Sequence, residues 1–460
     1  MHDPAARGLG GMGRVGAALQ YPPAGPAGIQ PFPGLGLSNL PMRRIAWLLI
    51  LPAVVSCGRA GARPAVEMRV DTVGDTIVVR TLAGSEWGPD VRLVEEVSIG
   101  ALEGEDAYML GDVRGLAVDA GGVIYALDQQ VPVLRAYGPD GRHLRDIGRD
   151  GGGPGEYERP DGGLAVLADG RILVRDPGTA RINVYAADGK TLGEWRLASG
   201  GGFNTGRKLY VDRAGNVYTM VLRERGKPPW EWRYALARYS PDGAHADSVL
   251  APEWDWQPPR VTASKENSSS SSNVPFSPTV SWTFSPLGYF AGGVATEYRV
   301  DLFRPGQPVL RIERRHQPVP VGAGEKAEAE ERVTRNMRSN YPGWRWNGPP
   351  IPEFKPPFRS VFAGDDGRIW VQLSQPSIEV MSEAEALEEE RRTENRPARF
   401  REGVAFDVFE PDGRYLGFVR APDGLSTSPE PVFRGDTIWA VVRDDLDVQH
   451  IVRFRIVRGE

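Results

Sequence analysis

The alternation of apolar and polar residues along positions 116–148 predicts four short β-strands. Their sequences are LAVD, VIYALD, VLRAY and HLRDI, and tight turns separate them at Ala120-Gly121-Gly122 and at Asp140-Gly141. A similar unit recurs along most of the chain. Units of about 40–50 residues with four strands each are typical of a β-propeller.

Two kinds of turn mark the repeats. The first turn, between strands one and two, lies near Gly122, Gly170, Gly215, Gly288, Gly367 and Asp436. The second turn, between strands three and four, ends at or near Gly141, Gly189, Gly243, Gly306 and Gly413. Asp-Gly sequences suit these turns because Gly accepts a positive φ and Asp bonds its own backbone. Six first turns and five second turns predict six blades, the last of which, over 432–457, lacks its fourth strand.

The missing strand is expected at the other end of the chain. Residues 97–100 (VSIG) are similar to residues 145–148 (RDIG), and each group ends 16 residues before the next first strand, at Leu116 and Leu164. We therefore predict that residues 91–99 complete blade six. The predicted fold is all-β: a six-bladed propeller over 91–460, closed by strands from both ends of the chain, with short helical insertions. Closure removes exposed sheet edges, and the hairpin-like segment 66–82 has no assigned place.

The repeat, and the linker GRDGGGPGEYERP at 148–160 in particular, resembles NHL-repeat proteins and related six-bladed bacterial propellers, some of them lipoproteins. The resemblance covers about residues 91–457 and is strongest in blades one and two. It implies the fold. Those families include scaffolds, binding modules and a few enzymes, so it does not imply one function.

The amino-terminal region predicts export. Met42-Arg43-Arg44 is basic, and residues 45–55 (IAWLLILPAVV) form an apolar run of signal-peptide length, short for a membrane span. The sequence VVSC, which ends at Cys57, resembles the bacterial lipobox, in which the cysteine is lipidated. A simple signal peptide followed by an incidental cysteine is the alternative.

These features give a domain organisation. We expect a disordered leader over 1–41 upstream of the true start at Met42, a lipoprotein signal peptide over 42–56, and a tether with a hairpin over 57–90. Gly58 takes the place of the Asp that often retains such lipoproteins in the inner membrane. The predicted location is the cell envelope, lipid-anchored at the outer membrane, with the anchor as the only membrane contact.

Net charge and the absence of known motifs exclude several classes of ligand and cofactor. A net charge of −5 over 460 residues argues against nucleic acid. The five histidines show no metal-ligand spacing, and no GxSxG, P-loop or HExxH motif occurs. We therefore expect no cofactor and no metal. Asp128 and Asp176, which end second strands, are expected to cap loops rather than to act as acids.

Four insertions interrupt the regular spacing, at 223–233, 252–277, 318–357 and 382–402. Because strands in a blade alternate in direction, all four emerge on one side, here called the insertion face, over blades three to five. The tight turns emerge on the opposite side, here called the hairpin face. Insertions confined to one face often mark a binding surface.

Three segments of the insertions have predicted structures. Residues 325–341 are expected to form a helix that packs through Val333, Met337 and Tyr341, and residues 382–396 to form a solvated helix. The serine run 268–272 is expected to be a flexible loop.

The insertions carry three W-x-W pairs, which in an extended chain place both rings on one side. They are Trp230 with Trp232, Trp254 with Trp256, and Trp344 with Trp346. One interpretation is an aromatic platform for a glycan, a peptide or an envelope protein. The other is that the rings anchor long loops to the propeller.

A second candidate site comes from the register of the first strands. Arg114, Arg207 and Arg359 each lie eight residues before a first-turn glycine, and Lys208 follows Arg207. First strands line the channel of a propeller, so this register predicts guanidinium groups around its mouth on the insertion face. Arg suits carboxylate or phosphate. Alternatively, each Arg pairs with a local acid, such as Asp112, Asp161 or Glu430.

Two functions follow. The first is a module that binds an anionic small molecule, a glycan or an envelope protein through the insertion face. The second is a hydrolase or lyase centred on the channel, by similarity to propeller lactonases, which hold a metal with Glu, Asn and Asp. The matching positions here are Arg, Gly, Arg, Val, Arg and Ser, a set that disfavours a bound cation.

Overall fold

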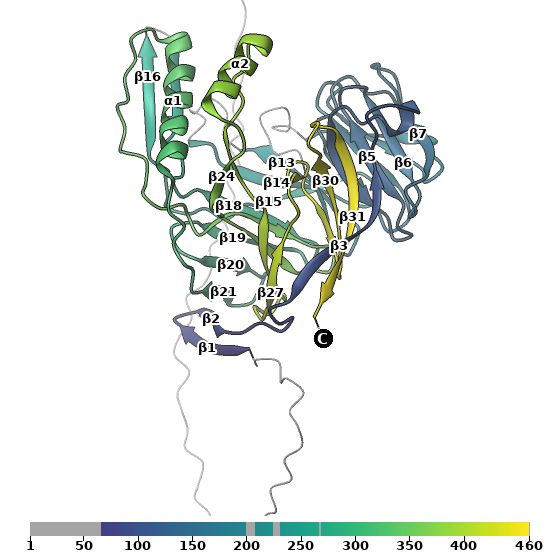
Figure 1. The fold of residues 1–460 in the computed structure, drawn as a ribbon. Coiled ribbons are helices and arrows are strands. Elements are labelled where there is room, and N and C mark those ends of the chain that lie inside the picture. The colour runs from purple at the N-terminus through teal and green to yellow at the C-terminus, as the bar shows by residue number, and fades with distance from the viewer. Residues whose placement is uncertain (1–65, 199–207, 224–230, 266–267, 460) are drawn as a thin grey trace, which may run out of the picture. The chain divides into compact units, whose positions relative to one another are not determined.

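A computed structural model describes residues 66–198, 208–223, 231–265 and 268–459. These residues form a six-bladed β-propeller with two α-helices in insertions (Figure 1). The predicted all-β fold is confirmed. The signal peptide, Cys57, Arg207 and Trp230 lie outside the described residues.

Blades one to three follow the predicted repeats as four-stranded antiparallel sheets. Blade one contains β4 (Val113–Val118), β5 (Ile124–Asp128), β6 (Val133–Tyr137) and β7 (His143–Ile147). Blade two contains β8 (Leu164–Val166), β9 (Ile172–Asp176), β10 (Arg181–Tyr185) and β11 (Thr191–Arg196). Blade three contains β12 (Leu209–Val211), β13 (Val217–Leu222), β14 (Tyr234–Tyr239) and β15 (His245–Leu250). Gly122 and Gly141 both have a φ of 84°, as their tight turns require.

Blades four to six carry the additions. Blade four contains β18 (Val280–Ser285), β19 (Tyr289–Val294), β20 (Arg299–Phe303) and β21 (Val309–Arg314). Blade five contains β22 (Phe358–Ala363), β23 (Ile369–Leu373), β26 (Ala405–Phe409) and β27 (Tyr415–Arg420). Blade six contains β28 (Leu425–Ser426), β29 (Val432–Arg434), β30 (Thr437–Arg443), β31 (Gln449–Arg458) and β3 (Val91–Ile99).

The ring closes as the sequence predicts. Strand β3 pairs antiparallel with β31, with Ile99 opposite Ile451. Both side chains are buried in the cluster between blades six and one. Blade six is therefore built from the two ends of the folded chain, which protects the edge of β31.

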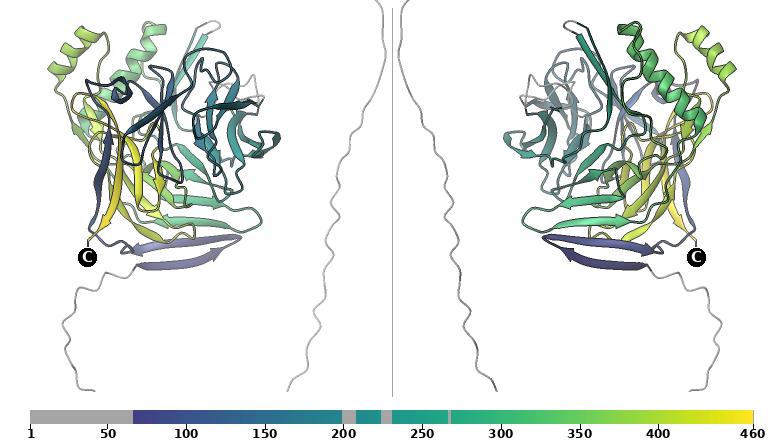
Figure 2. Two further views of the ribbon diagram at one scale, coloured as in Figure 1. Left: turned by 90° about the vertical axis from the view of Figure 1, so that its right-hand side faces the viewer. Right: turned by 90° about the vertical axis from the view of Figure 1, so that its left-hand side faces the viewer.

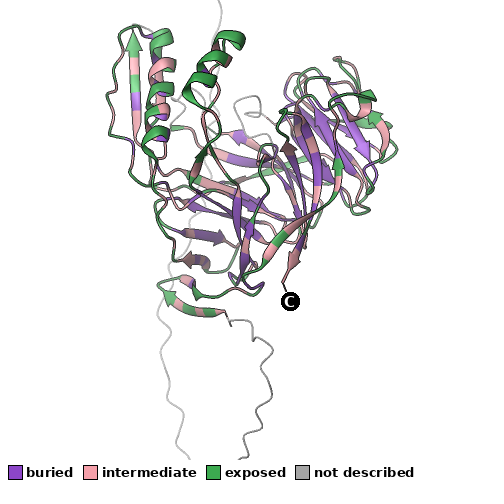
Figure 3. Ribbon diagram, in the orientation of Figure 1, coloured by how far each residue is buried: buried purple, intermediate pink, exposed green. Residues whose placement is uncertain are grey.

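The amino-terminal hairpin extends blade four. It consists of β1 (Glu67–Val73) and β2 (Thr76–Ala83), and β2 runs parallel to β21 with Val79 opposite Ile312. Val78 and Val79 are buried, whereas β1 is largely exposed along the outer edge (Figure 3). The hairpin lies away from α1 and α2 in every view (Figures 1 and 2).

The hydrophobic core consists of layers between consecutive blades. Six buried clusters each join two neighbouring blades. Between blades five and six, for example, the rings of Trp370 and Phe433 stack with centroids 4.2 Å apart. Packing between the blades leaves a channel at the centre of the ring.

The three insertions at 252–277, 318–357 and 382–402 pack together beside blades four and five in their described parts. They contain β16 (Arg260–Lys265), β17 (Ser268–Asn273), α1 (Ala323–Asn340), α2 (Glu383–Thr393) and β25 (Phe400–Glu402), and β24 (Ser377–Glu379) leads into the third of them. Figure 2 shows α1 and α2 on the same side of the propeller. Ion pairs connect the helices, including Arg335 Nη1 to Glu390 Oε1 at 2.9 Å.

Both predicted helices form, and one expectation is wrong. Val333 and Met337 of α1 are buried against Val261 of β16, while α2 buries only Ala386. The serine run forms strand β17, not a flexible loop, because β16 supplies a complete antiparallel partner. The Tyr341 hydroxyl also bonds to Ser268 Oγ at 2.8 Å. Tertiary pairing here overrides the weak strand preference of serine. Within the described residues, neither helix is both long and apolar enough to cross a membrane.

Candidate functional site

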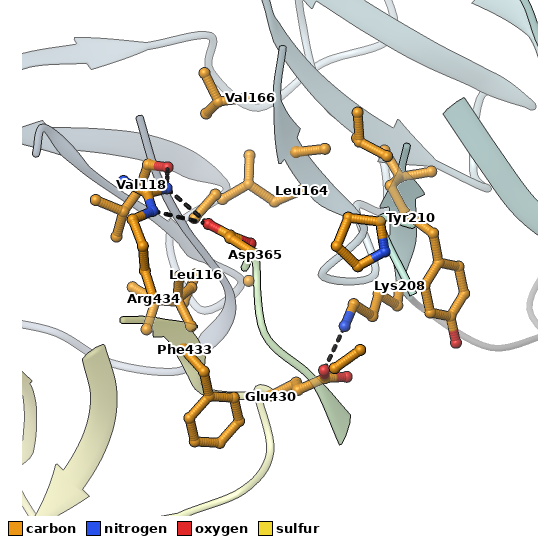
Figure 4. A pocket seen from close by; sticks show the side chains of 18 of the residues that line it. Leu116, Val118, Leu164, Val166, Lys208, Tyr210, Asp365, Glu430, Phe433 and Arg434 are labelled. Atoms are coloured by element: carbon orange, nitrogen blue, oxygen red, sulfur yellow. Dashed lines mark hydrogen bonds and ion pairs between the residues drawn. The ribbon is translucent and has the colours of Figure 1, made fainter. Parts of the chain in front are cut away.

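The central channel is a cavity of about 670 Å³ lined by residues from all six blades (Figure 4). The innermost strands and the residues that lead into and out of them form its wall. Its middle part is apolar, with the side chains of Leu116, Val118, Leu164, Leu209, Phe284 and Phe433. Charged side chains lie toward the two ends. A cavity of this size and polarity is suited to a small organic ligand.

An ion pair spans the mouth on the insertion face. Lys208 immediately precedes β12 of blade three, and Glu430 precedes β29 of blade six, the opposite blade of the ring. Lys208 Nζ bonds to Glu430 Oε1 across the channel (Figure 4). The side chains are 34% and 26% exposed, so solvent reaches this pair.

Arg114 lies at the same mouth on β4. Its Nε donates to Asp112 Oδ2 at 2.7 Å. The main-chain N–H of Asp112 is held in turn by the Asp128 carboxylate at 3.0 Å. In blade two, Gly162 packs so closely that a Cβ there would lie 2.2 Å from the carbonyl oxygen of Arg114. This contact and a φ of +93° require glycine at position 162.

The hairpin end of the channel is tied by side chains that cross between blades. Arg434 Nη2 contacts Asp365 Oδ2 at 2.7 Å and donates to the Val118 carbonyl at 2.8 Å, which links blades five, six and one (Figure 4). Asp119 and Asp212 also line this end, but their carboxylates accept main-chain N–H groups of the first turns. The charges at this end therefore hold the ring together.

Tyr210 lines the wall below Lys208. Lys208 Nζ lies 5.1 Å from the centre of its ring. Burial raises the pKa of Tyr210, and the nearby charge of Glu430 acts in the same direction. The phenol is therefore neutral at physiological pH.

The structure separates the predicted arginines. Arg114 and Lys208 line the channel, whereas Arg359 of β22 is not among the lining residues. Its side chain is 52% exposed and its Nη1 lies 3.4 Å from Glu402 Oε2. Arg207 is outside the described residues, so among the described arginines of this register only Arg114 lines the mouth, together with Lys208, the residue after Arg207.

A buried lysine that no sequence pattern indicates, Lys355, holds the insertions together. Lys355 Nζ bonds to Glu325 Oε1 at 2.7 Å, Glu402 Oε1 at 3.0 Å and Ser377 Oγ at 2.9 Å. These partners come from α1, β25 and β24. Lys355 lies in a proline-rich segment without periodicity, so only the folded chain reveals its partners.

The described tryptophans of the insertions contact neighbouring segments. Trp344 Nε1 donates to the Thr262 carbonyl, Trp346 Nε1 to the Pro349 carbonyl, and Trp256 Nε1 to the Pro278 carbonyl. The Trp254 ring packs edge-on against Phe303, and Trp232 is half-buried. Such contacts fasten loops.

Asp128 and Asp176 cap loops, as predicted. Asp128 accepts N–H groups of Gly111, Asp112 and Gln130. Asp176 accepts those of Glu158, Arg159 and Gly178. Each carboxylate thereby fixes the segment that leads into the first strand of its own blade. In the described part of the chain, no three His, Cys, Asp or Glu side chains cluster in a way that could hold a metal ion.

Comparisons with known proteins concern the fold. No protein-family model matches the chain, and no curated protein matches it significantly. A DUF4221-family member from Bacteroides vulgatus has 10% identity and a TM-score of 0.47, covering 80% of this chain and 99% of that one. A gluconolactonase from Xanthomonas campestris has 15% identity and a TM-score of 0.39, covering 88% and 99%. Virginiamycin B lyase from Staphylococcus aureus has 10% identity and a TM-score of 0.37, covering 80% and 100%.

Proposed function

We propose that this protein is an exported, lipid-anchored β-propeller that binds an anionic small molecule in its central channel. The ligand enters from the insertion face. The observation that carries the proposal is the placement of Lys208, in a partly exposed ion pair, beside Arg114 at one mouth of a cavity of about 670 Å³ whose middle part is apolar. Cations at the opening of a low-dielectric cavity favour a ligand with negative charge.

The two ends of the channel differ in a way that supports this direction. At the hairpin end, Arg434 is held by Asp365 and by the Val118 carbonyl, so its donors are occupied by the fold itself. At the insertion end, the Lys208–Glu430 pair is partly exposed. Exposed ion pairs contribute little to stability and can be exchanged.

Export and anchoring rest on the amino-terminal sequence. The basic residues 42–44, the apolar run 45–55 and Cys57 support a lipoprotein signal peptide with a lipid anchor at the outer membrane. Expressed from Met42, the protein should incorporate labelled fatty acid and partition into detergent. Cys57→Ser should abolish both, and labelling that survives this substitution would contradict the anchor.

Ligand binding is tested by thermal unfolding of the mature protein with a panel of small anions and neutral analogues of matched size. A ligand that binds only the folded state raises the melting temperature with its concentration. We expect stabilisation by anions that is lost in Lys208→Met. Stabilisation that depends instead on Trp344 or Trp346 would place the site on the insertions. Chemical change of the added compound would support the hydrolase or lyase alternative.

A further inference from the structure

We infer that the channel ligand is an amphiphile with one carboxylate, whose head group replaces Glu430 on Lys208 and whose apolar body lies in the channel. This inference rests on the proposed function and narrows the ligand to a chemical class. It follows from the juxtaposition of a replaceable internal carboxylate and an apolar cavity immediately below it.

The head group is inferred from the partner that Lys208 already has. Lys208 Nζ binds a carboxylate from the opposite side of the channel, so the ammonium group is positioned for a carboxylate at the centre of the mouth. Glu430 stands in that position as an internal counterpart of a ligand. A competing carboxylate replaces one ion pair by another, so the charge of Lys208 stays compensated.

We infer that the ligand carries a single negative charge because Arg114, the second cation at this mouth, already has a local partner. The guanidinium of Arg114 is held by Asp112, only two residues away on the same segment. Asp112 is in turn fixed through its N–H by the buried Asp128. Arg114 is therefore already neutralised locally, and Lys208 is the cation at this mouth whose partner comes from another blade. At this mouth, a dianion would find only one exchangeable cation among the described residues.

The apolar body is inferred from the wall. Below Lys208 the channel is lined by Leu116, Leu164, Leu209 and Phe433, and the next charged groups are those at the hairpin end. Asp365 and Arg434 are occupied with each other there. A hydroxyl-rich body would lose hydrogen bonds to water, and the side chains of this wall offer few replacements, which is unfavourable. An alkyl or aryl body gains by leaving water.

The test measures affinity of the mature protein for hexanoate, octanoate and decanoate, below micelle concentrations, by calorimetry. Each added methylene that enters the channel should raise affinity about threefold to fourfold. Octanol, octylamine and gluconate should bind at least tenfold more weakly than octanoate. Gluconate matters because it carries the same head group on a polar body.

Three variants distinguish an exchangeable ion pair from a structural one. Lys208→Met should weaken octanoate binding at least tenfold, because a charge-assisted bond is lost. Glu430→Gln should strengthen it severalfold, because the internal competitor loses its charge. Glu194→Gln is the matched control: Glu194 pairs with Arg181 on the outer strands of blade two, away from the channel, and its loss should change nothing.

The outcomes separate the two proposals. Lys208-dependent binding of gluconate in preference to octanoate would overturn the amphiphile and leave the proposed anion site standing. Equal affinities in Glu430→Gln and Glu194→Gln would overturn the replacement of Glu430. If no anion binds in a Lys208-dependent way, the proposed function itself fails. Lys208→Arg, which keeps the charge, should retain binding and shows whether a loss in Lys208→Met reflects folding.

Discussion

Lys208 and Glu430 are 222 residues apart in the chain, yet their side chains bond across the central channel. They meet because blades three and six are opposite one another in a ring of six. The pair marks the mouth on the insertion face as the end where a charged group can be exchanged. At the hairpin end, Arg434 is fixed by main-chain carbonyls as well as by Asp365.

The first prediction is that the Lys208–Glu430 pair contributes little to stability. Both side chains are partly exposed, so water screens their attraction. A double-mutant cycle of Lys208→Met and Glu430→Gln should give a coupling energy below about 1 kcal/mol. The measurement is chemical denaturation without ligand. A coupling of several kcal/mol would show instead that the pair stabilises the fold.

Asp128 should contribute far more to the stability of the fold than the Lys208–Glu430 pair, although it does not line the channel. It is buried, accepts three main-chain N–H groups and pairs with buried Arg135. Asp128→Ala should lower the free energy of unfolding by about 3–5 kcal/mol, because Arg135 loses its counter-charge. Asp140→Ala removes one exposed turn bond in the same blade and should cost less than about 1 kcal/mol. Equal losses would contradict this account of blade one.

Lys355 should stabilise the insertions but not blades one and two. Lys355→Met leaves Glu325 and Glu402 buried together without their shared cation. Hydrogen exchange should accelerate in α1 and in β24 and β25, while blades one and two keep their protection. Adding Glu325→Gln and Glu402→Gln to Lys355→Met should restore part of the protection of the insertions, because no uncompensated buried charge remains; Arg359, which loses its contact with Glu402, is half exposed.

A matched control for that experiment is Lys190→Met. Lys190 pairs with Asp188 at a fully solvated turn, with its side chain 81% exposed. Exchange in the insertions should be unchanged by this substitution. If Lys355→Met behaves like Lys190→Met, the buried network does not hold the insertions.

His316 should make stability depend on pH. Burial lowers the pKa of His316, and the charge of Arg314 acts in the same direction against the opposing effect of Asp407. The folded state thus binds the proton less readily than the unfolded state. As pH falls through about 6.5, the unfolded state gains a proton first and stability decreases.

This dependence is measured by denaturation between pH 7.5 and 5.5. Wild type should lose stability faster than His316→Gln, by at most about 1.4 kcal/mol per pH unit. Unfolding at each pH should be followed in both proteins by far-ultraviolet circular dichroism, because the 12 tryptophans mask any signal from tyrosines such as Tyr298 beside the imidazole. Identical slopes would mean that His316 is not the titrating group.

The blades and their closure could be predicted from the sequence because their signals are local and repeated. A turn glycine such as Gly122 fixes the place of two strands, and the similarity of 97–100 to 145–148 identifies β3. The serine strand β17 could not be predicted, since its stability comes from β16 and from Tyr341 of a distant insertion.

The site was only partly predictable for a related reason. Register against the first-turn glycine correctly predicts that Arg114 lines the channel, as does Lys208 next to Arg207, but Arg359 at the same register is not among the lining residues. Arg359 contacts Glu402, which lies in an insertion and is also held by buried Lys355. The position of a residue along one strand does not predict its contacts with residues of a long insertion. The sequence suggests Glu430 as a partner for an arginine, but its bond to Lys208 could not be predicted, because opposite blades are related by ring geometry and not by spacing in sequence.

Binding of an amphiphilic carboxylate in the channel can be seen directly in a crystal structure of the mature protein soaked with 8-bromooctanoate, using the anomalous signal of bromine. We expect one strong peak inside the channel, between the innermost strands, with the carboxylate on Lys208 and Glu430 displaced from it. A peak confined to the insertions, beside Trp344 and Trp346 or on α2, or an empty channel at concentrations that saturate binding in solution, would contradict it.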